Sequence, residues 1–254
     1  MEQSNFLKVA LKAVKEAETI ILKYYKKEMD IQIKEDTSPV TQADTEAEKC
    51  IKKIIKEHFP DHGFIGEESG KESSTSEYTW IIDPIDGTKN FTRNIPLFAT
   101  LLALMKNNEI ILGVSNLPAL NELLYAEKGK GAYYNEKKLK VSTKKHLNEA
   151  YLTFGSLRYM DNHINELMEL VKNTHAHRGI GDAYCYHHLA QGNVDIMVEA
   201  SVEIWDIAPY KIIVEEAQGK VTNLQGKPIT VDSKNILTTN GFLHDKALEI
   251  LNKK

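Results

Sequence analysis

The chain has 254 residues, of which 42% are hydrophobic and 27% are charged, with a formal net charge of −4. This composition is that of an ordinary globular protein that buries a sizeable core. The negative balance argues against a nucleic-acid-binding protein, which usually carries a basic face. It does not argue against a phosphate substrate, because bound divalent cations can reverse the local field.

The cysteines and the hydropathy of the chain predict the cellular compartment of the protein. Cys50 and Cys185 form no Cys-x-x-Cys pair, so we expect neither a disulfide framework nor a thiolate zinc site. Residues 1–18 mix charges through an amphipathic pattern and do not resemble a signal peptide. The longest mainly apolar run, 96–105, is about half of the ~20 residues that span a bilayer. We therefore expect a cytoplasmic protein with no membrane partner.

The N-terminal segment has the periodicity of two helices. Apolar residues at helical spacing predict a long amphipathic helix over residues 6–24, with Ser4 as its N-cap. A second helix carries apolar side chains between Ala47 and Ile55 and should stop before Pro60. The polar stretch between them, residues 35–43, indicates a loop or a short hairpin.

The middle of the chain has the pattern of a β-sheet. Short apolar runs stand at residues 64–65, 79–82, 97–105, 110–114 and 123–126. Turn residues separate them, among them Asn107, Asn108, Gly129 and Gly131. Strands that follow one another without helices predict an antiparallel meander.

After about residue 145, helices and strands alternate. We expect a helix over 182–191 ended by Gly192, a strand over 196–198, and a helix over 207–217 with Pro209 in its first turn. No repeat or flexible linker interrupts the chain. The predicted fold class is α+β with two sheets, in two tightly packed halves, residues 1–145 and 146–254.

One motif follows a buried strand and is rich in carboxylates. Asp83-Pro84-Ile85-Asp86-Gly87-Thr88 comes directly after the apolar residues 80–82. Pro84 favours an extended conformation at Asp83, and Gly87 permits a sharp turn. Both aspartates can therefore point into one small space, where they would repel each other unless a cation is bound. Oxygen-only ligands favour magnesium over zinc.

Two further segments can complete such a site. Glu67, in Gly66-Glu67-Glu68-Ser69, and Asp206, after Trp205, also lie where strands end or a helix starts. Two metals held by these acids would clamp the attacking and leaving oxygens of a phosphoryl transfer. Each segment alone has a simpler interpretation: Asp-Gly is commonly a turn, and Asp206 could be an N-cap. The three segments together favour a catalytic site.

These segments resemble the inositol monophosphatase family, in which a Gly-Glu-Glu segment, a Trp-(apolar)2-Asp-Pro-(Ile/Leu)-Asp-Gly-Thr core and a later Trp-Asp occur in this order. Here they stand at Gly66, at 80–88 and at Trp205, and the resemblance extends from Ser38 to Gly219. It implies a layered αβαβα sandwich with two mixed or antiparallel sheets, commonly assembled as a homodimer. It also implies hydrolysis of a small-molecule phosphate ester with two or three Mg²⁺ ions.

The resemblance further implies roles for single residues. Glu67, Asp83, Asp86, Asp206 and the Ile85 carbonyl would bind the metals. Thr88, with Asp44 or Glu67 nearby, would orient a metal-bound water for in-line attack, and the Gly87 and Thr88 amides would face the phosphate. The pattern leaves open whether Asp36 reaches a third metal or faces solvent.

The substrate is predicted from residues 178–203. Glu199 lies where inositol monophosphatases use a Glu to bind ring hydroxyls, whereas residues 178–184, with Arg178 and Asp182, resemble the histidinol-phosphatase branch. An acidic pair of Asp182 and Glu199 could hold a cationic amine. We therefore expect histidinol phosphate as the leading substrate, with inositol monophosphate or a nucleotide bisphosphate as alternatives.

Two other classes of protein remain to be distinguished. Haloacid-dehalogenase phosphatases use Asp-x-Asp, but here two residues, Pro84 and Ile85, separate the aspartates. A non-catalytic metal-binding scaffold is the other alternative, although every expected ligand is present. His187 and His188 lack a His-x-x-x-His partner and are interpreted as surface or partly buried residues, not as a zinc site.

Overall fold

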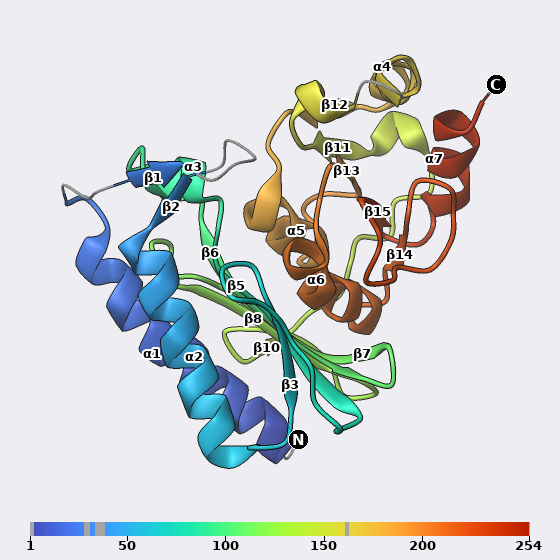
Figure 1. The fold of residues 1–254 in the computed structure, drawn as a ribbon. Coiled ribbons are helices and arrows are strands. Elements are labelled where there is room, and N and C mark those ends of the chain that lie inside the picture. The colour runs from blue at the N-terminus through green and yellow to red at the C-terminus, as the bar shows by residue number, and fades with distance from the viewer. Residues whose placement is uncertain (1–2, 28–30, 34–38, 161–162, 254) are drawn as a thin grey trace.

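The computed structural model describes residues 3–27, 31–33, 39–160 and 163–253. Figure 1 shows helix pairs alternating with two sheets, which confirms the predicted layered α+β fold. The helix pairs are α1 (Asn5–Tyr24) with α2 (Gln42–His58), α5 (Asp182–Ala190) with α6 (Ile204–Glu216), and α4 (Ile164–Asn173) with α7 (His244–Leu251). The middle pair, α5 and α6, lies between the two sheets.

The larger sheet has eight strands in the order β10-β9-β8-β7-β6-β5-β3-β4. These are β3 (Gly63–Gly66), β4 (Gly70–Glu72), β5 (Tyr78–Asp86), β6 (Ala99–Lys106), β7 (Glu109–Leu117), β8 (Glu122–Glu127), β9 (Gly131–Tyr134) and β10 (Lys137–Lys138). The predicted antiparallel meander is confirmed from β5 to β10. Strand β3 differs, because it pairs parallel with β5. Strand β4, which follows β3 in the sequence, pairs antiparallel with β3 on its other side and forms the edge of the sheet.

The smaller sheet has five strands in the order β12-β11-β13-β15-β14. These are β11 (Tyr151–Phe154), β12 (Ala176–Arg178), β13 (Ile196–Ala200), β14 (Lys220–Thr222) and β15 (Asn235–Thr239). Every strand of this sheet follows residue 145. Helix α6 nevertheless packs on β7 of the larger sheet, so one hydrophobic core joins the two predicted halves.

Short elements complete the chain. They are β1 (Ile31–Ile33), which pairs antiparallel with β2 (Pro39–Thr41), the helix α3 (Thr88–Phe91), and the 3₁₀ turns η1 (Leu147–Glu149) and η2 (Leu157–Tyr159). Of the expected loop or hairpin, residues 35–38 lie outside the described residues, residues 39–41 form β2, and α2 already begins at Gln42. Asp36 lies outside the described residues. Both cysteines are free, and no helix in the described ranges is long and apolar enough to cross a membrane.

Helix ends follow local capping chemistry. Ser4 caps α1 as predicted, because its Oγ accepts a hydrogen bond from the Leu7 amide at 3.1 Å. Helix α6 begins earlier than the sequence predicts, and Pro209 lies inside it and not in its first turn. The reason is a capping box at Glu203, in which the Glu203 amide donates to Asp206 Oδ2 at 2.7 Å. Asp206 is therefore the third helical residue and not the N-cap.

A buried polar network links the halves. Ser115 Oγ on β7 is hydrogen bonded to His187 Nε2 on α5 at 2.8 Å and to the Tyr210 hydroxyl on α6 at 2.7 Å. The other ring nitrogen of His187 lies 3.2 Å from Glu122 Oε2. The prediction that His187 is a surface or partly buried residue is wrong, since it is 0% exposed. Its burial is possible because both ring nitrogens have partners.

Candidate active site

The end of β5 is shaped so that two aspartates face the same space. The pairing of β5 with β6 shifts register between Asp83 and Asp86, and the Thr100 hydroxyl holds the Pro84 carbonyl at 3.0 Å. Gly87 then turns the chain with φ of 80°. A Cβ at Gly87 would lie 2.9 Å from the Leu97 carbonyl oxygen, so the turn requires glycine there.

Three of the four predicted carboxylate ligands come together. Single carboxylate oxygens of Asp83, Asp86 and Asp206 all lie within 4.8 Å of one another. Asp83 and Asp86 come from β5, whereas Asp206 projects from the first turn of α6 in the other half of the chain. The sheet and the helix therefore build this cluster jointly.

Burial and mutual repulsion make these acids difficult to ionise. Burial raises the pKa of Asp83 well above its usual range, and the nearby charges of Glu67, Asp86 and Asp206 raise it further. Burial likewise has the largest effect on the pKa of Asp86 and raises it. The charges of Asp182 and Asp206 raise it further. For Asp206, burial raises the pKa to about 7 against the opposing hydrogen bond from the Glu203 amide. A bound cation would reverse these shifts.

The donor set fits a hard divalent cation. Asp83 Oδ1 is buried and has no hydrogen-bond partner among the described residues, which is costly for a carboxylate oxygen unless another ligand is present. All three acids offer oxygen, and Mg²⁺ prefers oxygen ligands. The cluster therefore suits Mg²⁺ better than a metal that requires nitrogen or sulfur.

Glu67 lies beside the three aspartates without belonging to their group. It directly follows β3, and its backbone amide donates to the Ile82 carbonyl of β5 at 3.1 Å. Among the neighbouring charges, that of Glu67 has the largest effect on the pKa of Asp83, and it also acts on Asp206. Glu67 is thus close enough to take part in the site, and its role as a metal ligand stays a prediction.

Asp44 and Thr88 meet at the edge of this cluster. Asp44 is buried on α2, where its Oδ2 accepts hydrogen bonds from the Thr41 amide at 2.8 Å and the Thr41 hydroxyl at 2.6 Å. The Thr88 hydroxyl lies 3.5 Å from Asp44 Oδ1 and 2.9 Å from the Ile85 carbonyl oxygen. Burial raises the pKa of Asp44 to about 6, with the Thr41 hydrogen bonds opposing. Thr88 and Asp44, which the resemblance links, thus lie within 3.5 Å of each other.

Two adjoining cavities open beside the acids. A cavity of about 490 Å³ is lined by Glu67, Gly87 and Thr88, and a smaller one of about 110 Å³ by Asp86, Glu199 and Asp206. Ser156, Tyr159 and Asp182 line both cavities. A small ester could therefore place its phosphate at Thr88 and its organic part at the second half of the chain.

Asp182 and Glu199 form the far wall of this space. The Asp182 amide donates to Glu199 Oε1 at 2.9 Å, and the Tyr186 hydroxyl donates to Glu199 Oε2 at 2.7 Å. Burial raises the pKa of Glu199 to about 8, with the Asp182 charge adding to the shift. Burial also raises the pKa of Asp182, whereas the Lys89 ammonium opposes that shift.

Arg178 occupies a different environment. It lies on the edge strand β12, is exposed, and donates from its guanidinium to the His177 carbonyl at 2.7 Å. Arg178 does not line either of the two cavities. Its substrate-binding role stays a prediction.

Sequence reasoning missed several residues that line the site. Lys89 and Asn90 follow the metal motif directly, and Ser156, Arg158 and Tyr159 lie in the segment after β11. Strand β11 was not predicted, so nothing pointed to the loop that follows it. Lys89 and Asn90 could have been found from their position beside Thr88.

The two mixed sheets and the aspartate cluster at their interface define a phosphatase of the inositol monophosphatase type. The model of the inositol monophosphatase family matches residues 2–254, and the chain belongs to that family. A fructose-1,6-bisphosphatase/inositol-1-monophosphatase of Thermotoga maritima is 40% identical over 215 residues, covering 84% of this chain and 82% of the relative. A histidinol-phosphatase of Mycobacterium tuberculosis is 36% identical over 232 residues, covering 89% of each chain.

The solved structures agree with this assignment. An IMPase from Thermotoga maritima superimposes with a TM-score of 0.90 at 34% sequence identity, covering 98% of each chain. The resemblance inferred from the motifs is therefore confirmed, and the protein is a phosphatase of a metal-dependent family.

Proposed function

We propose that this protein hydrolyses a small-molecule phosphate monoester with two or three Mg²⁺ ions held by Asp83, Asp86, Asp206, Glu67 and the Ile85 carbonyl. The convergence of three aspartate oxygens within 4.8 Å is the observation that supports this most directly. The partnerless buried oxygen of Asp83 adds to it. Bound there, Mg²⁺ would neutralise the acids and the charge that develops on the transferring phosphoryl group.

The protein's own groups would position the attacking water and take up its proton. The Thr88 hydroxyl can accept a hydrogen bond from water while it donates to Asp44 or to the Ile85 carbonyl. With a pKa of about 6, Asp44 is mostly ionised at neutral pH and can accept a proton through Thr88. Glu67 lines the same cavity and is the alternative orienting group. Because phosphoryl transfer depends mainly on positioning and charge, no Cys or His nucleophile is required.

For the substrate we propose histidinol phosphate, bound with its phosphate at Gly87 and Thr88 and its cationic amine toward Asp182 and Glu199. Both acids line the cavity that adjoins Asp86 and Asp206, and Tyr159 adds an aromatic ring to the wall. The names of the relatives do not decide the substrate, since a 40% identical relative is named for inositol and fructose phosphates and a 36% identical one for histidinol phosphate.

A panel of esters tests both parts of the proposal. Phosphate release is measured with histidinol phosphate, an inositol monophosphate, a nucleotide bisphosphate and an aryl phosphate, with Mg²⁺ or with EDTA. We expect hydrolysis only with Mg²⁺ and the highest kcat/KM for histidinol phosphate. Mg²⁺ binding without turnover of any ester would indicate a non-catalytic scaffold, and preference for the inositol ester would select the alternative substrate.

Asp182→Ala tests the contact with the amine. Loss of one charged hydrogen bond is worth about 1.5–3 kcal/mol, so KM for histidinol phosphate should rise on the order of tenfold or more. KM for an inositol phosphate should change less, because that substrate carries no cation. Equal effects on the two substrates would overturn this part of the proposal.

Light scattering of the parent protein tests the homodimer that membership of the family suggests.

A further inference from the structure

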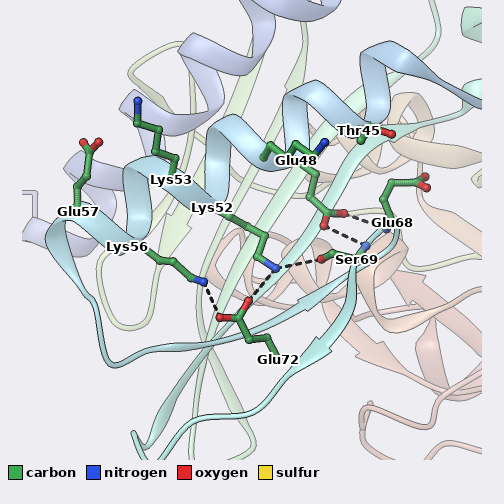
Figure 2. Close-up of a pocket in the computed structure, with 10 residues that line it drawn as sticks. Thr45, Glu48, Lys52, Lys53, Lys56, Glu57, Glu68, Ser69 and Glu72 are labelled. Carbon is green, nitrogen blue, oxygen red and sulfur yellow. Dashed lines mark hydrogen bonds and ion pairs between the residues drawn. The ribbon is translucent and has the colours of Figure 1, made fainter.

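Helix α2 carries a second buried carboxylate one turn after Asp44, and the proposed chemistry does not use it. Glu48 is 2% exposed. Its Oε2 accepts a hydrogen bond from the Glu68 amide at 2.9 Å, and its Oε1 accepts one from the Ser69 amide at 3.1 Å. Figure 2 shows both bonds running from α2 to the turn between β3 and β4. Two successive backbone amides bound to one carboxylate tie the turn to α2 at two points.

The anchored turn is the one that carries Glu67. Gly66 and Gly70 pair across its base, and the Glu67 amide is held by the Ile82 carbonyl at 3.1 Å. The turn is thus bound to β5 on one side and to Glu48 on the other. The contact with Glu48 is close, since a Cβ built at Gly66 would lie 2.5 Å from Glu48 Oε1. A side chain at position 66 would displace the Glu48 carboxylate from the place that it has beside the turn.

The same face of α2 serves two segments of the site. Asp44 and Glu48 are four residues apart, so both project from one side of the helix. Asp44 lies 3.5 Å from the Thr88 hydroxyl, and Glu48 holds the turn after Glu67. Ala47 and Ile51 fix α2 in the hydrophobic core. The spacing between the Thr88 segment and the Glu67 turn is therefore set by a rigid helix.

We propose that Glu48 is a positioning residue, which fixes the Glu67 carboxylate relative to Asp83 and Asp206 and thereby sets the affinity of the site for Mg²⁺. The inference rests on the proposed function for the identity of the metal. Hydrogen-bond partners behind metal ligands typically account for about 10–100-fold in metal affinity. The turn after β3 bears Glu67, the proposed carboxylate ligand outside the aspartate cluster, and Glu48 binds the amides of the two residues that follow it.

A second acid on the same hairpin offers a matched control. Figure 2 shows Glu72 on the same hairpin, where it pairs with Lys52 at 3.0 Å and Lys56 at 2.5 Å. Its side chain is 45% exposed, and its carboxylate pairs with the two lysines, whereas Glu48 accepts the hydrogen bonds of the turn amides. Glu72→Gln therefore removes one negative charge from the hairpin without releasing the turn.

The test compares Glu48→Gln, Glu48→Ala and Glu72→Gln in the full chain. Mg²⁺ binding is titrated by calorimetry without substrate, unfolding is followed in EDTA, and kinetics are measured over a range of Mg²⁺ concentrations. We expect Mg²⁺ to bind about 10–100-fold more weakly to Glu48→Ala. Glu48→Gln, which keeps the volume and one acceptor, should be intermediate. Substrate KM at saturating Mg²⁺ should not change in either variant, and Glu72→Gln should bind Mg²⁺ like the parent.

Parent-like Mg²⁺ affinity in the Glu48 variants would overturn this inference alone, even if they unfold more easily. If Glu48→Ala does not fold, Glu48→Gln decides the outcome, because it preserves the packing. A parent protein that binds no Mg²⁺ would instead overturn the proposed function together with the inference.

Discussion

The backbone amide of Ala183 donates a hydrogen bond to Asp86 Oδ2 at 3.0 Å, although the two residues are 97 positions apart. Asp86 ends β5 of the larger sheet, and Ala183 lies in the first turn of α5. The bond uses only part of the accepting capacity of the Asp86 carboxylate, which also contributes an oxygen to the acid cluster. The arrangement of Asp86 is therefore complete only when the two sheets and the helices between them are packed.

Two substitutions at Asp86 should separate its charge from its hydrogen bond. Asp86→Asn can still accept from the Ala183 amide, so we expect near-parental stability in EDTA with loss of nearly all turnover. Asp86→Ala should lose turnover and in addition about 1–3 kcal/mol of unfolding free energy, because the amide is left without its partner. Urea unfolding and phosphate release measure the two effects. Equal stabilities for both variants would show that the hydrogen bond contributes nothing.

Asp83→Asn should abolish activity without destabilising the metal-free protein. Asp83 is 2% exposed and surrounded by acids, so its replacement removes repulsion from the core. We expect the unfolding free energy in EDTA at neutral pH to stay equal or to rise. Turnover close to that of the parent at saturating Mg²⁺ would contradict a role for Asp83 as metal ligand.

The stability of the metal-free protein should depend on pH through Asp206. Its pKa is about 7 in the folded state and about 4 in the unfolded chain. Between about pH 4 and 7 the native state binds more protons than the unfolded chain. The contribution of Asp206 to the unfolding free energy is therefore fully present below about pH 4 and is lost as the pH rises through about 7. Glu199, with a pKa of about 8, should act in the same direction over a slightly higher range.

Asp206→Asn isolates this contribution. In EDTA, the variant should become more stable than the parent by a margin that grows between about pH 4 and 7 and then levels off. Saturating Mg²⁺ should reverse the order, because the ionised acid binds the metal and metal binding releases protons. A margin that is independent of pH in EDTA would be inconsistent with the raised pKa of Asp206.

Ser115→Ala should weaken the contact between the halves and leave the metal site intact. The change removes the hydrogen bonds of Ser115 Oγ to His187 Nε2 and the Tyr210 hydroxyl, both fully buried. We expect a loss of about 1–3 kcal/mol in unfolding free energy. Calorimetric Mg²⁺ affinity should remain that of the parent. A change in affinity without a loss of stability would show that the network acts on the site.

Local patterns predicted much of the fold because they depend on neighbours in the chain. The short apolar runs and the turn residues between Phe64 and Ala126 were sufficient for the meander, since strands joined by short turns pair with each other. The start of α6 was misplaced because the capping box at Glu203 uses an acid where Ser or Thr is more usual. Tight packing of the two halves was expected, but the sequence did not predict that α6 is the helix that packs on the larger sheet, because that contact joins residues far apart in the chain.

In the candidate site, too, residues within one motif could be recognised from the sequence, whereas residues that act through distant contacts could not. The motif around Asp83 and Asp86 was recognisable because Pro84 and Gly87 act on adjacent residues, and membership of the family followed from such motifs. Glu48 and Tyr159 carried no motif. Their importance depends on which backbone groups or cavities lie beside them after folding.

By itself, the sequence determined the acids, the turn that exposes them and the α+β class, because these follow from residue type and spacing along the chain. The tertiary structure alone decided that His187 is buried and that Glu48 holds the Glu67 turn, and it showed how closely Asp206, expected from its motif, approaches the β5 aspartates. These are contacts between residues far apart in the chain. They form only when burial of the shared core offsets the cost of bringing charged groups together.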